Sequence, residues 1–125
     1  MCGISGLFGP GAGEESGRAL VQAMSRKLLH RGPDESGFAH GKDFSLGHRR
    51  LSIIDIKSGQ QPMFSEDGRY VLVYNGELYN SDELRQRLRL HGVSLSSHSD
   101  TELLLKALIA EGEFILPHLS GMFAF

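Results

Sequence analysis

The chain begins with MCGISGLFG, residues 1–9, a short apolar stretch broken by three glycines. Residues 4–8 alternate in the way typical of a short buried strand. The stretch also contains Cys2, the single cysteine among the 125 residues. A free cysteine is usually a small apolar filler. This one stands directly behind the initiator methionine, so its position suggests a second interpretation, that of a nucleophile placed at the start of a strand.

Removal of Met1 would leave Cys2 with a thiol and a free α-amine on the same carbon. The α-amine has a reference pKa of about 8, close to the thiol reference value of about 8.5, so it can accept the thiol proton without a separate histidine. An N-terminal threonine works in this way in one variant of the catalytic triad. Glycine at position 3 removes side-chain bulk beside the thiol. Both interpretations of Cys2, filler and nucleophile, stay open at this point.

The composition limits the classes of partner. At 125 residues, one domain is expected, able to bury roughly two thirds of the surface of the unfolded chain. A net charge of -2 argues against nucleic acid, because backbone binding needs an excess of Lys and Arg. The first residues lack the charged leader of a signal peptide, and no stretch has the roughly 18 apolar residues of a membrane span. The sequence therefore predicts a cytoplasmic protein without disulfides and without nucleic-acid or membrane partners.

Three segments carry helical signals. From Glu15, the spacing of apolar residues follows the helical period and predicts one buried stripe. Two more helices are predicted after Asn80 and Ser99, because a glutamate follows each of them three residues later, as in a capping box. The residues expected on the buried faces are Leu20, Val21, Met24 and Leu28 in the first helix, Leu84 and Leu88 in the second, and Leu104, Leu105, Leu108 and Ile109 in the third.

Extended segments are predicted at FSLGHRRLSIID (44–55), at YVLVYNG (70–76), where a strand runs into an Asn-Gly turn, and at LSGMFAF (119–125). Strands and helices are segregated rather than strictly alternating, which is typical of the α+β class. The last run ends the chain inside a strand-like segment. Native ends are rarely strand interiors, so we expect the 125 residues to be a C-terminally truncated domain with an open sheet edge, prone to association.

The sequence YNGE, residues 74–77, offers a site for a developing negative oxygen. The side-chain amide of Asn75 and the backbone N–H of Gly76 can both donate a hydrogen bond to an oxyanion. Asn-Gly after a strand is also the commonest hairpin signal. The segment that follows turns into a helix, which makes the hairpin less favoured.

Two charged residues could bind the ends of an amino acid. Arg50 stands in the apolar run RLSII and would be costly to bury without a carboxylate partner, which a substrate carboxylate could supply. Asp100 stands at the start of a predicted helix, where it could bind an ammonium group or simply stabilise the helix dipole. HRGPD, residues 30–34, is interpreted as a structural Gly-Pro turn. Four further histidines, His40, His91, His98 and His118, show no spacing typical of metal ligands, and no metal site is expected.

Seven stretches together resemble a known family. They are MCGI at the start, HRGPD at 30–34, GHRRLSIID at 47–55, QP at 61–62, YNGELYN at 74–80, SDTE at 99–102 and GMFAF at 121–125. In this order and spacing, residues 1–125 resemble the N-terminal glutaminase domain of class II glutamine amidotransferases, most closely the asparagine synthetase type. The resemblance implies an α+β N-terminal nucleophile hydrolase fold, a sandwich of two antiparallel sheets between helical layers.

The resemblance also implies a reaction, in which the side-chain amide of L-glutamine is hydrolysed to glutamate and ammonia through a thioester. According to this resemblance, Cys2 corresponds to the nucleophile, and Asn75 and Gly76 correspond to the oxyanion hole. Arg50 corresponds to the residue that holds the substrate carboxylate, and Asp100 to the residue that contacts the substrate amine. The other residues that would line the pocket are Leu51, Ser52, Ile53, Ile54 and Glu77.

Members of this family continue past GMFAF through further strands into a synthetase domain that uses ATP and Mg²⁺. The resemblance therefore implies no cofactor for residues 1–125, L-glutamine as substrate, a C-terminal synthetase domain of the same chain as partner, and a homo-oligomer as a further assembly that it allows. Two alternatives stay open. One is an amidotransferase of an exopolysaccharide system with a different acceptor, and the other is a catalytically silent module that senses glutamine.

Overall fold

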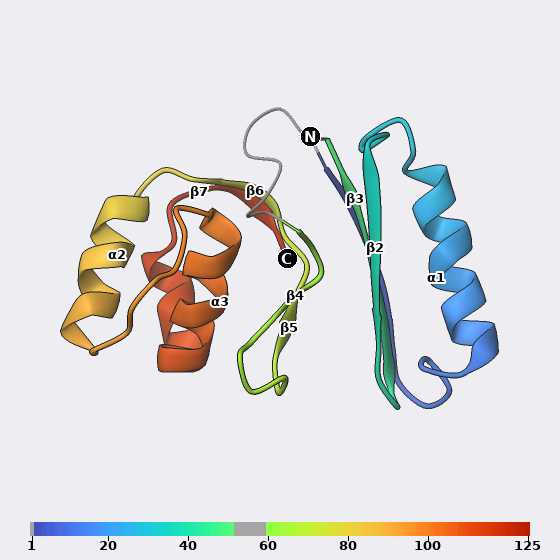
Figure 1. Ribbon diagram of the computed structural model, residues 1–125, viewed down its shortest axis with the longest axis horizontal. Coiled ribbons are helices and arrows are strands. Elements are labelled where there is room, and N and C mark those ends of the chain that lie inside the picture. Colours follow the sequence, from blue (N-terminus) through green and yellow to red (C-terminus); the bar gives the residue numbers. More distant parts are fainter. Residues whose placement is uncertain (1, 52–59) are drawn as a thin grey trace.

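The computed structural model describes residues 2–51 and 60–125, and its helices and strands form layers (Figure 1). Ser52, Ile53 and Ile54, predicted to line the substrate pocket, lie outside the described residues. The elements are β1 (Gly3–Phe8), α1 (Glu15–Lys27), β2 (Glu35–His40), β3 (Phe44–Arg50), β4 (Met63–Phe64), β5 (Val71–Leu72), β6 (Asn75–Leu78), α2 (Ser81–Leu90), α3 (Asp100–Glu111), the 3-10 helix η1 (Gly112–His118) and β7 (Gly121–Ala124).

The largest sheet among the described residues has three antiparallel strands in the order β1-β3-β2. Helix α1 covers one of its faces (Figure 1) and buries Val21 and Ser25 against it. The predicted stripe on α1 is only partly confirmed, because Leu20 and Met24 are exposed at 50% and 37%. Val21 and Ser25 are four residues apart and share one side of the helix, so the buried side is narrower than the apolar spacing suggests.

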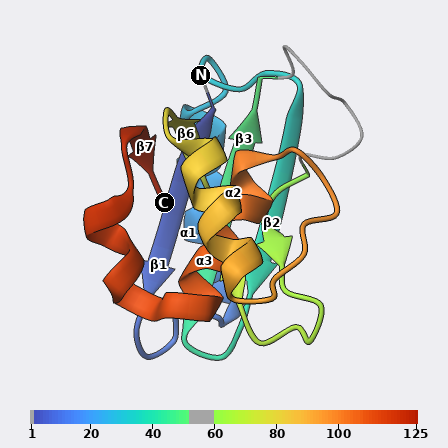
Figure 2. The ribbon, with the colours of Figure 1, turned by 90° about the vertical axis from the view of Figure 1, so that its left-hand side faces the viewer.

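The second half of the chain packs around the helices α2 and α3. Strands β4 and β5 form one two-stranded antiparallel sheet, and β6 and β7 form another. Figure 2, turned by 90°, shows α2 and α3 on the side of the molecule away from α1. The core of this half is mainly aliphatic, and its largest fully buried side chains are Leu84, Leu88, Leu103, Leu104 and Ile115.

A smaller apolar cluster joins the two halves. Val73, directly after β5, packs with Leu46 of β3 and Ala39 of β2, on the side of the three-stranded sheet that α1 does not cover. The α+β class and the antiparallel pairing are confirmed, and the arrangement is compatible with an N-terminal nucleophile hydrolase fold. The described strands form one three-stranded and two two-stranded sheets, so the sandwich of two sheets stays a prediction.

The Asn-Gly turn predicted at the end of YVLVYNG is wrong. Asn75 and Gly76 are the first two residues of β6, and they pair with Ala124 and Phe123 of β7. A strand from the far end of the chain supplies this pairing, which local turn preferences cannot indicate. The predicted strand near the C-terminus is confirmed as β7.

The two predicted helix caps have different outcomes. Ser99 caps α3, because its hydroxyl accepts a hydrogen bond from the Thr101 N–H at 3.2 Å. Asn80 precedes α2 as predicted, but its side chain makes no cap. Its amide instead donates to the His118 carbonyl at 2.8 Å and accepts from the Ser120 N–H at 3.0 Å. The Asn80 side chain therefore holds the start of α2 to the segment that leads into β7.

Candidate functional site

Cys2 and Arg50 lie at the same end of the three-stranded sheet. Gly3 pairs with Arg49 across the antiparallel β1 and β3 ladder, so Cys2 comes just before the first pair and Arg50 just after it. Cys2 is a free, partly buried cysteine. Figure 1 shows the start of β1 beside the end of β3. The strand register thus brings together two predicted site residues that are 48 positions apart in the sequence.

The glycine after Cys2 has a packing role. A side chain at Gly3 would have its Cβ 3.0 Å from Cβ of Leu28, the C-cap of α1. That distance is closer than ordinary carbon contacts of about 3.5–4.0 Å. Contact with Leu28 explains this glycine without reference to a substrate.

Arg50 is buried and has a carboxylate partner within the chain. Its Nη1 lies 3.2 Å from Oε2 of Glu35, which is opposite Arg50 in the β2 and β3 register. The Glu35 side chain is 41% exposed, so the ion pair opens toward solvent. A substrate carboxylate reaching Arg50 would meet a guanidinium that is already held in place by Glu35. Sequence reasoning missed Glu35 because it directly follows the predicted turn HRGPD, and nothing in the sequence indicates that β2 begins there.

The HRGPD segment supports the backbone at Arg50. A Cβ on Gly32 would overlap the carbonyl carbon of Arg49, so only glycine allows this approach. The N–H of Asp34 donates to the carbonyl of Arg50 at 3.1 Å. The interpretation of HRGPD as structural agrees with these contacts, and the segment holds the end of β3 in place.

His48 stands two residues before Arg50 on β3 and is 1% exposed. Residues two apart on a strand share a face, and both line a cavity of about 440 Å³ together with Glu35 and Gln61. Burial lowers the pKa of His48 to about 4. A hydrogen bond to the Tyr74 backbone opposes this shift, and the positive charge of the Arg50 guanidinium lowers the pKa further. The imidazole is therefore neutral at pH 7, and its Nε2 has no hydrogen-bond partner within residues 2–51 and 60–125.

The predicted amine-binding residue, Asp100, contacts the strand that carries the predicted oxyanion residues. The carboxylate of Asp100 accepts a hydrogen bond from the Leu78 N–H at 2.9 Å, which joins the start of α3 to β6. Burial raises the pKa of Tyr74, and the nearby carboxylates of Asp100 and Glu77 raise it further. Asp100 thus contacts β6 at Leu78 and also lies near the side chain of Tyr74, the residue before Asn75. Asp100 thus does more than stabilise the dipole of α3.

Three of the four residues of β6 are at least partly exposed. Asn75 is partly buried, whereas Gly76 and Glu77 are exposed. A Cβ on Gly76 would overlap the carbonyl oxygen of Met122 in β7, so this glycine is required by the close approach of two backbones. Leu51, directly after Arg50, is partly buried. The roles of these residues toward a substrate stay predictions.

Gln61 connects several of these elements and was missed as a site residue. Its side chain hydrogen-bonds to the backbone of Tyr74 and to the hydroxyl of Thr101, the residues adjacent to Asn75 and Asp100. The only signal in the sequence was the QP pair at 61–62, and nothing in a glutamine followed by a proline indicates its partners.

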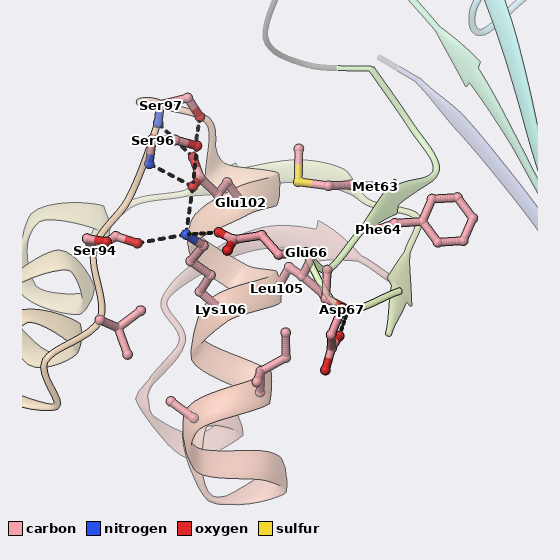
Figure 3. A pocket seen from close by; sticks show the side chains of 14 residues that line it. Met63, Phe64, Glu66, Asp67, Ser94, Ser96, Ser97, Glu102, Leu105 and Lys106 are labelled. Carbon is pink, nitrogen blue, oxygen red and sulfur yellow. Dashed lines mark hydrogen bonds and ion pairs between the residues drawn. The ribbon is translucent and has the colours of Figure 1, made fainter. Parts of the chain in front are cut away.

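The loop before α3 is held by a buried carboxylate. Figure 3 shows Ser96 and Ser97 converging on Glu102, with Lys106 on its other side. Glu102 accepts hydrogen bonds from the backbone N–H and hydroxyl groups of both serines at 2.6–2.8 Å, and Nζ of Lys106 lies 3.3 Å away. These residues line a cavity of about 730 Å³ that also includes Met63. The contacts fix the first turn of α3, where Asp100 stands.

Replacing Glu102 by glutamine is expected to destabilise the fold by about 2–4 kcal/mol at pH 7, because an amide nitrogen would face hydrogen-bond donors in a buried site. Burial alone would raise the pKa of Glu102, but the hydrogen bonds from Ser96, Ser97 and Lys106 outweigh burial and lower it to about 2. A lowered folded-state pKa means that this contribution is present above pH ~4.3, the value for an unperturbed glutamate, and is lost as the pH falls toward 2.

Urea unfolding of the wild type and Glu102→Gln at pH 7 and pH 3 measures this effect. The exposed Glu113 of η1 provides the matched control, Glu113→Gln. The difference between wild type and Glu102→Gln should shrink at pH 3. Equal stability of the two proteins at pH 7 would contradict the assignment.

Two further observations concern the described residues as a whole. Within residues 2–51 and 60–125, no group of three or more His, Cys, Asp and Glu side chains is arranged to hold a metal ion. In the same part of the chain, no helix combines the length and the apolar character needed to cross a membrane.

A family model and individual related proteins both match this chain, and they agree on the family. A family model described as "Glutamine amidotransferase domain" matches residues 1–125. The sequence is 42% identical over 127 residues to asparagine synthetase [glutamine-hydrolyzing] 1 of Bacillus subtilis (strain 168), covering 100% of this chain and 20% of that protein. It is also 42% identical over 125 residues to asparagine synthetase [glutamine-hydrolyzing] of Asparagus officinalis, covering 100% of this chain and 21% of that protein. The chain thus spans about a fifth of the length of these relatives.

Proposed function

The chain belongs to the glutamine amidotransferase family, and on this basis we propose that it hydrolyses the side-chain amide of L-glutamine through a thioester on Cys2. The observation that carries the proposal is the pairing of β1 with β3, which holds Cys2 beside Arg50. A glutamine whose α-carboxylate pairs with Arg50 would have its side-chain amide free to reach Cys2. This arrangement supports a nucleophile and a carboxylate clamp acting on one small amino acid.

The proposed first step is attack of the Cys2 thiol on the amide carbon. With Met1 removed, the α-amine of Cys2 takes the thiol proton and later delivers a proton to the departing ammonia. The negative charge that develops on the amide oxygen is stabilised by the Asn75 side-chain amide and the Gly76 N–H. Water then attacks the thioester and releases glutamate, which restores the thiol.

The recognition of the substrate amine is assigned to Asp100, with Glu77 nearby. The carboxylate of Asp100 already accepts the Leu78 N–H through Oδ2. A carboxylate has two oxygens with several lone pairs, so it can bind an ammonium group in addition. Leu51 and the three residues after it are proposed to line the same pocket.

We further propose that the ammonia serves a synthetase domain in the same protein, since the relatives are named asparagine synthetase [glutamine-hydrolyzing] and are about five times longer than this chain. ATP and Mg²⁺ would belong to that domain. The experiment is to incubate the purified protein with L-glutamine and measure glutamate and ammonia. Their release in equal amounts, with a glutamyl adduct on Cys2 after acid quenching, is the expected result. Binding of glutamine without release would indicate a silent sensing module instead.

Two variants separate the oxyanion and amine-binding roles. Asn75→Ala is expected to lower kcat by roughly 10² to 10³, the usual loss for one oxyanion-hole donor. Asp100→Asn keeps an oxygen that can accept the Leu78 N–H but removes the charge, so it is expected mainly to raise KM for glutamine. Steady-state glutamate release measures both. The reverse pattern, with Asn75→Ala affecting only KM and Asp100→Asn only kcat, would contradict the two assignments.

A further inference from the structure

We propose that Gln61 is a positioning residue that fixes the two halves of the glutaminase site relative to each other. The sheet half consists of Cys2 and Arg50, and the strand and helix half consists of Asn75, Gly76 and Asp100. This inference rests on the proposed function, because it concerns the geometry of that site. It adds a residue that would not touch the substrate.

Gln61 binds both backbone groups of the residue before Asn75. Its Oε1 accepts the N–H of Tyr74 at 2.5 Å, and its Nε2 donates to the carbonyl of Tyr74 at 3.0 Å. A side-chain amide that pairs with both groups of one residue replaces a neighbouring strand at that point. It therefore sets where β6 begins, and with it the position of Asn75.

The same nitrogen also reaches α3. Nε2 of Gln61 lies 3.2 Å from Oγ1 of Thr101, which is 5% exposed and directly follows Asp100. One side chain thus connects the residue adjacent to the proposed oxyanion donor with the residue adjacent to the proposed amine ligand. Leu78 and Asp100 make the second connection between β6 and α3, at the other end of the strand.

The backbone of Gln61 rests on the sheet half. A Cβ on Gly37 of β2 would overlap the carbonyl oxygen of Gln61, so the two backbones touch. Gln61 also lines the cavity of about 440 Å³ shared by Arg50 and His48. The residue therefore contacts the sheet through its backbone and the strand and helix half through its side chain.

The chemistry at this position requires an amide. One end of the side chain must accept one hydrogen bond and the other must donate two, and glutamine supplies both. Glutamate would place an oxygen against the Tyr74 carbonyl, and methionine would leave the buried partners unsatisfied. The length also matters, because the reach to Tyr74 and Thr101 is set by the fixed backbone contact at Gly37.

The test compares Gln61→Met, Gln61→Glu and Thr101→Val with wild type, using Gln86→Met on the exposed side of α2 as the matched control. The measured quantities are kcat and KM for L-glutamine, with kcat expressed per active site. Active sites are counted from the amount of glutamyl adduct on Cys2 after acid quenching. Dissociation constants for glutamine are measured in the Cys2→Ala background. The melting temperature is recorded for every variant.

Both Gln61 variants are expected to lower kcat/KM per active site by about 10- to 100-fold, because displacements near 1 Å are amplified to this extent in catalysis. Their kcat falls and their KM rises, since both Asn75 and Asp100 are displaced, and the dissociation constant rises with KM. Thr101→Val, which removes only the connection to α3, is expected to raise KM and leave kcat within about threefold of wild type. Gln86→Met is expected to match wild type.

A merely structural role for Gln61 would lower the melting temperature and the number of active sites but leave kcat/KM per active site within twofold of wild type. If the wild type and Gln86→Met are active, that outcome overturns the inference about Gln61 and leaves the proposed function standing. A wild type that releases no glutamate overturns both.

Discussion

Cys2→Ala is expected to abolish glutamate and ammonia release, with a loss on the order of 10⁶ in kcat, the scale seen when a catalytic nucleophile is removed. Cys2 precedes β1 and lies outside the paired residues of the three-stranded sheet. Truncating its side chain should therefore leave the fold and glutamine binding intact. The prediction separates a nucleophile from a small apolar filler, which would change stability slightly and turnover little.

The measurement pairs glutamate release with glutamine binding by calorimetry. In a protein that carries the proposed synthetase domain, product formation from free ammonia should continue at the wild-type rate, because it bypasses the thioester. Glutamine-dependent product formed by Cys2→Ala at the wild-type rate would contradict the assignment of Cys2.

Blocking the α-amine of Cys2 is expected to lower turnover by about 10² to 10⁴, the range that a positioned general base contributes. The amine is the proposed base because it is attached to the same carbon as the thiol, and a peptide bond to a preceding residue removes its basic lone pair. Active protein should therefore have lost Met1. Met1 itself lies outside the described residues.

A removable extension in front of Cys2 tests the amine directly. The extended protein should be nearly inactive and should regain activity when a protease exposes Cys2 as the first residue, with the mass of the N-terminus confirming the cleavage. The same extension on Cys2→Ala controls for effects on folding and for contaminating glutaminase. Full activity in protein that retains Met1 would rule the mechanism out.

The sequence singles out individual candidate residues, whereas it says little about their surroundings. Cys2, Arg50 and Asp100 stand out because each is unusual for its place, as a lone thiol, a cation in an apolar run and an acid at a helix start. The strand register places Cys2 beside Arg50, and a hydrogen bond from Leu78 joins Asp100 to β6, while the roles of all three toward a substrate stay predictions. Partners such as Glu35 could not be predicted, because pairing across a sheet depends on a register that forms only in the folded protein.

Asn75 illustrates a strand pairing that the local sequence could not predict. Its neighbour Gly76 signals a turn in local terms, and the structure instead places both in a strand whose partner, β7, comes more than 40 residues later. The contacts of Gln61 with Tyr74 and Thr101 are likewise long-range and have no periodicity that a sequence pattern could reveal. The class of the fold follows from composition and pattern, whereas the geometry of the site follows from pairings between distant segments.

The close contacts at Gly32, Gly37 and Gly76 bear on how a comprehensive substitution library for this domain should be interpreted. At each position, a single added carbon meets backbone atoms of another segment, so nearly every replacement is excluded by volume alone. Intolerance at these glycines therefore reports crowding between main chains, even where a glycine also serves chemistry, as proposed for Gly76. Information about substrate handling is concentrated instead in accessible polar side chains such as Asn75 and Glu77, where size and charge can be varied independently of the backbone.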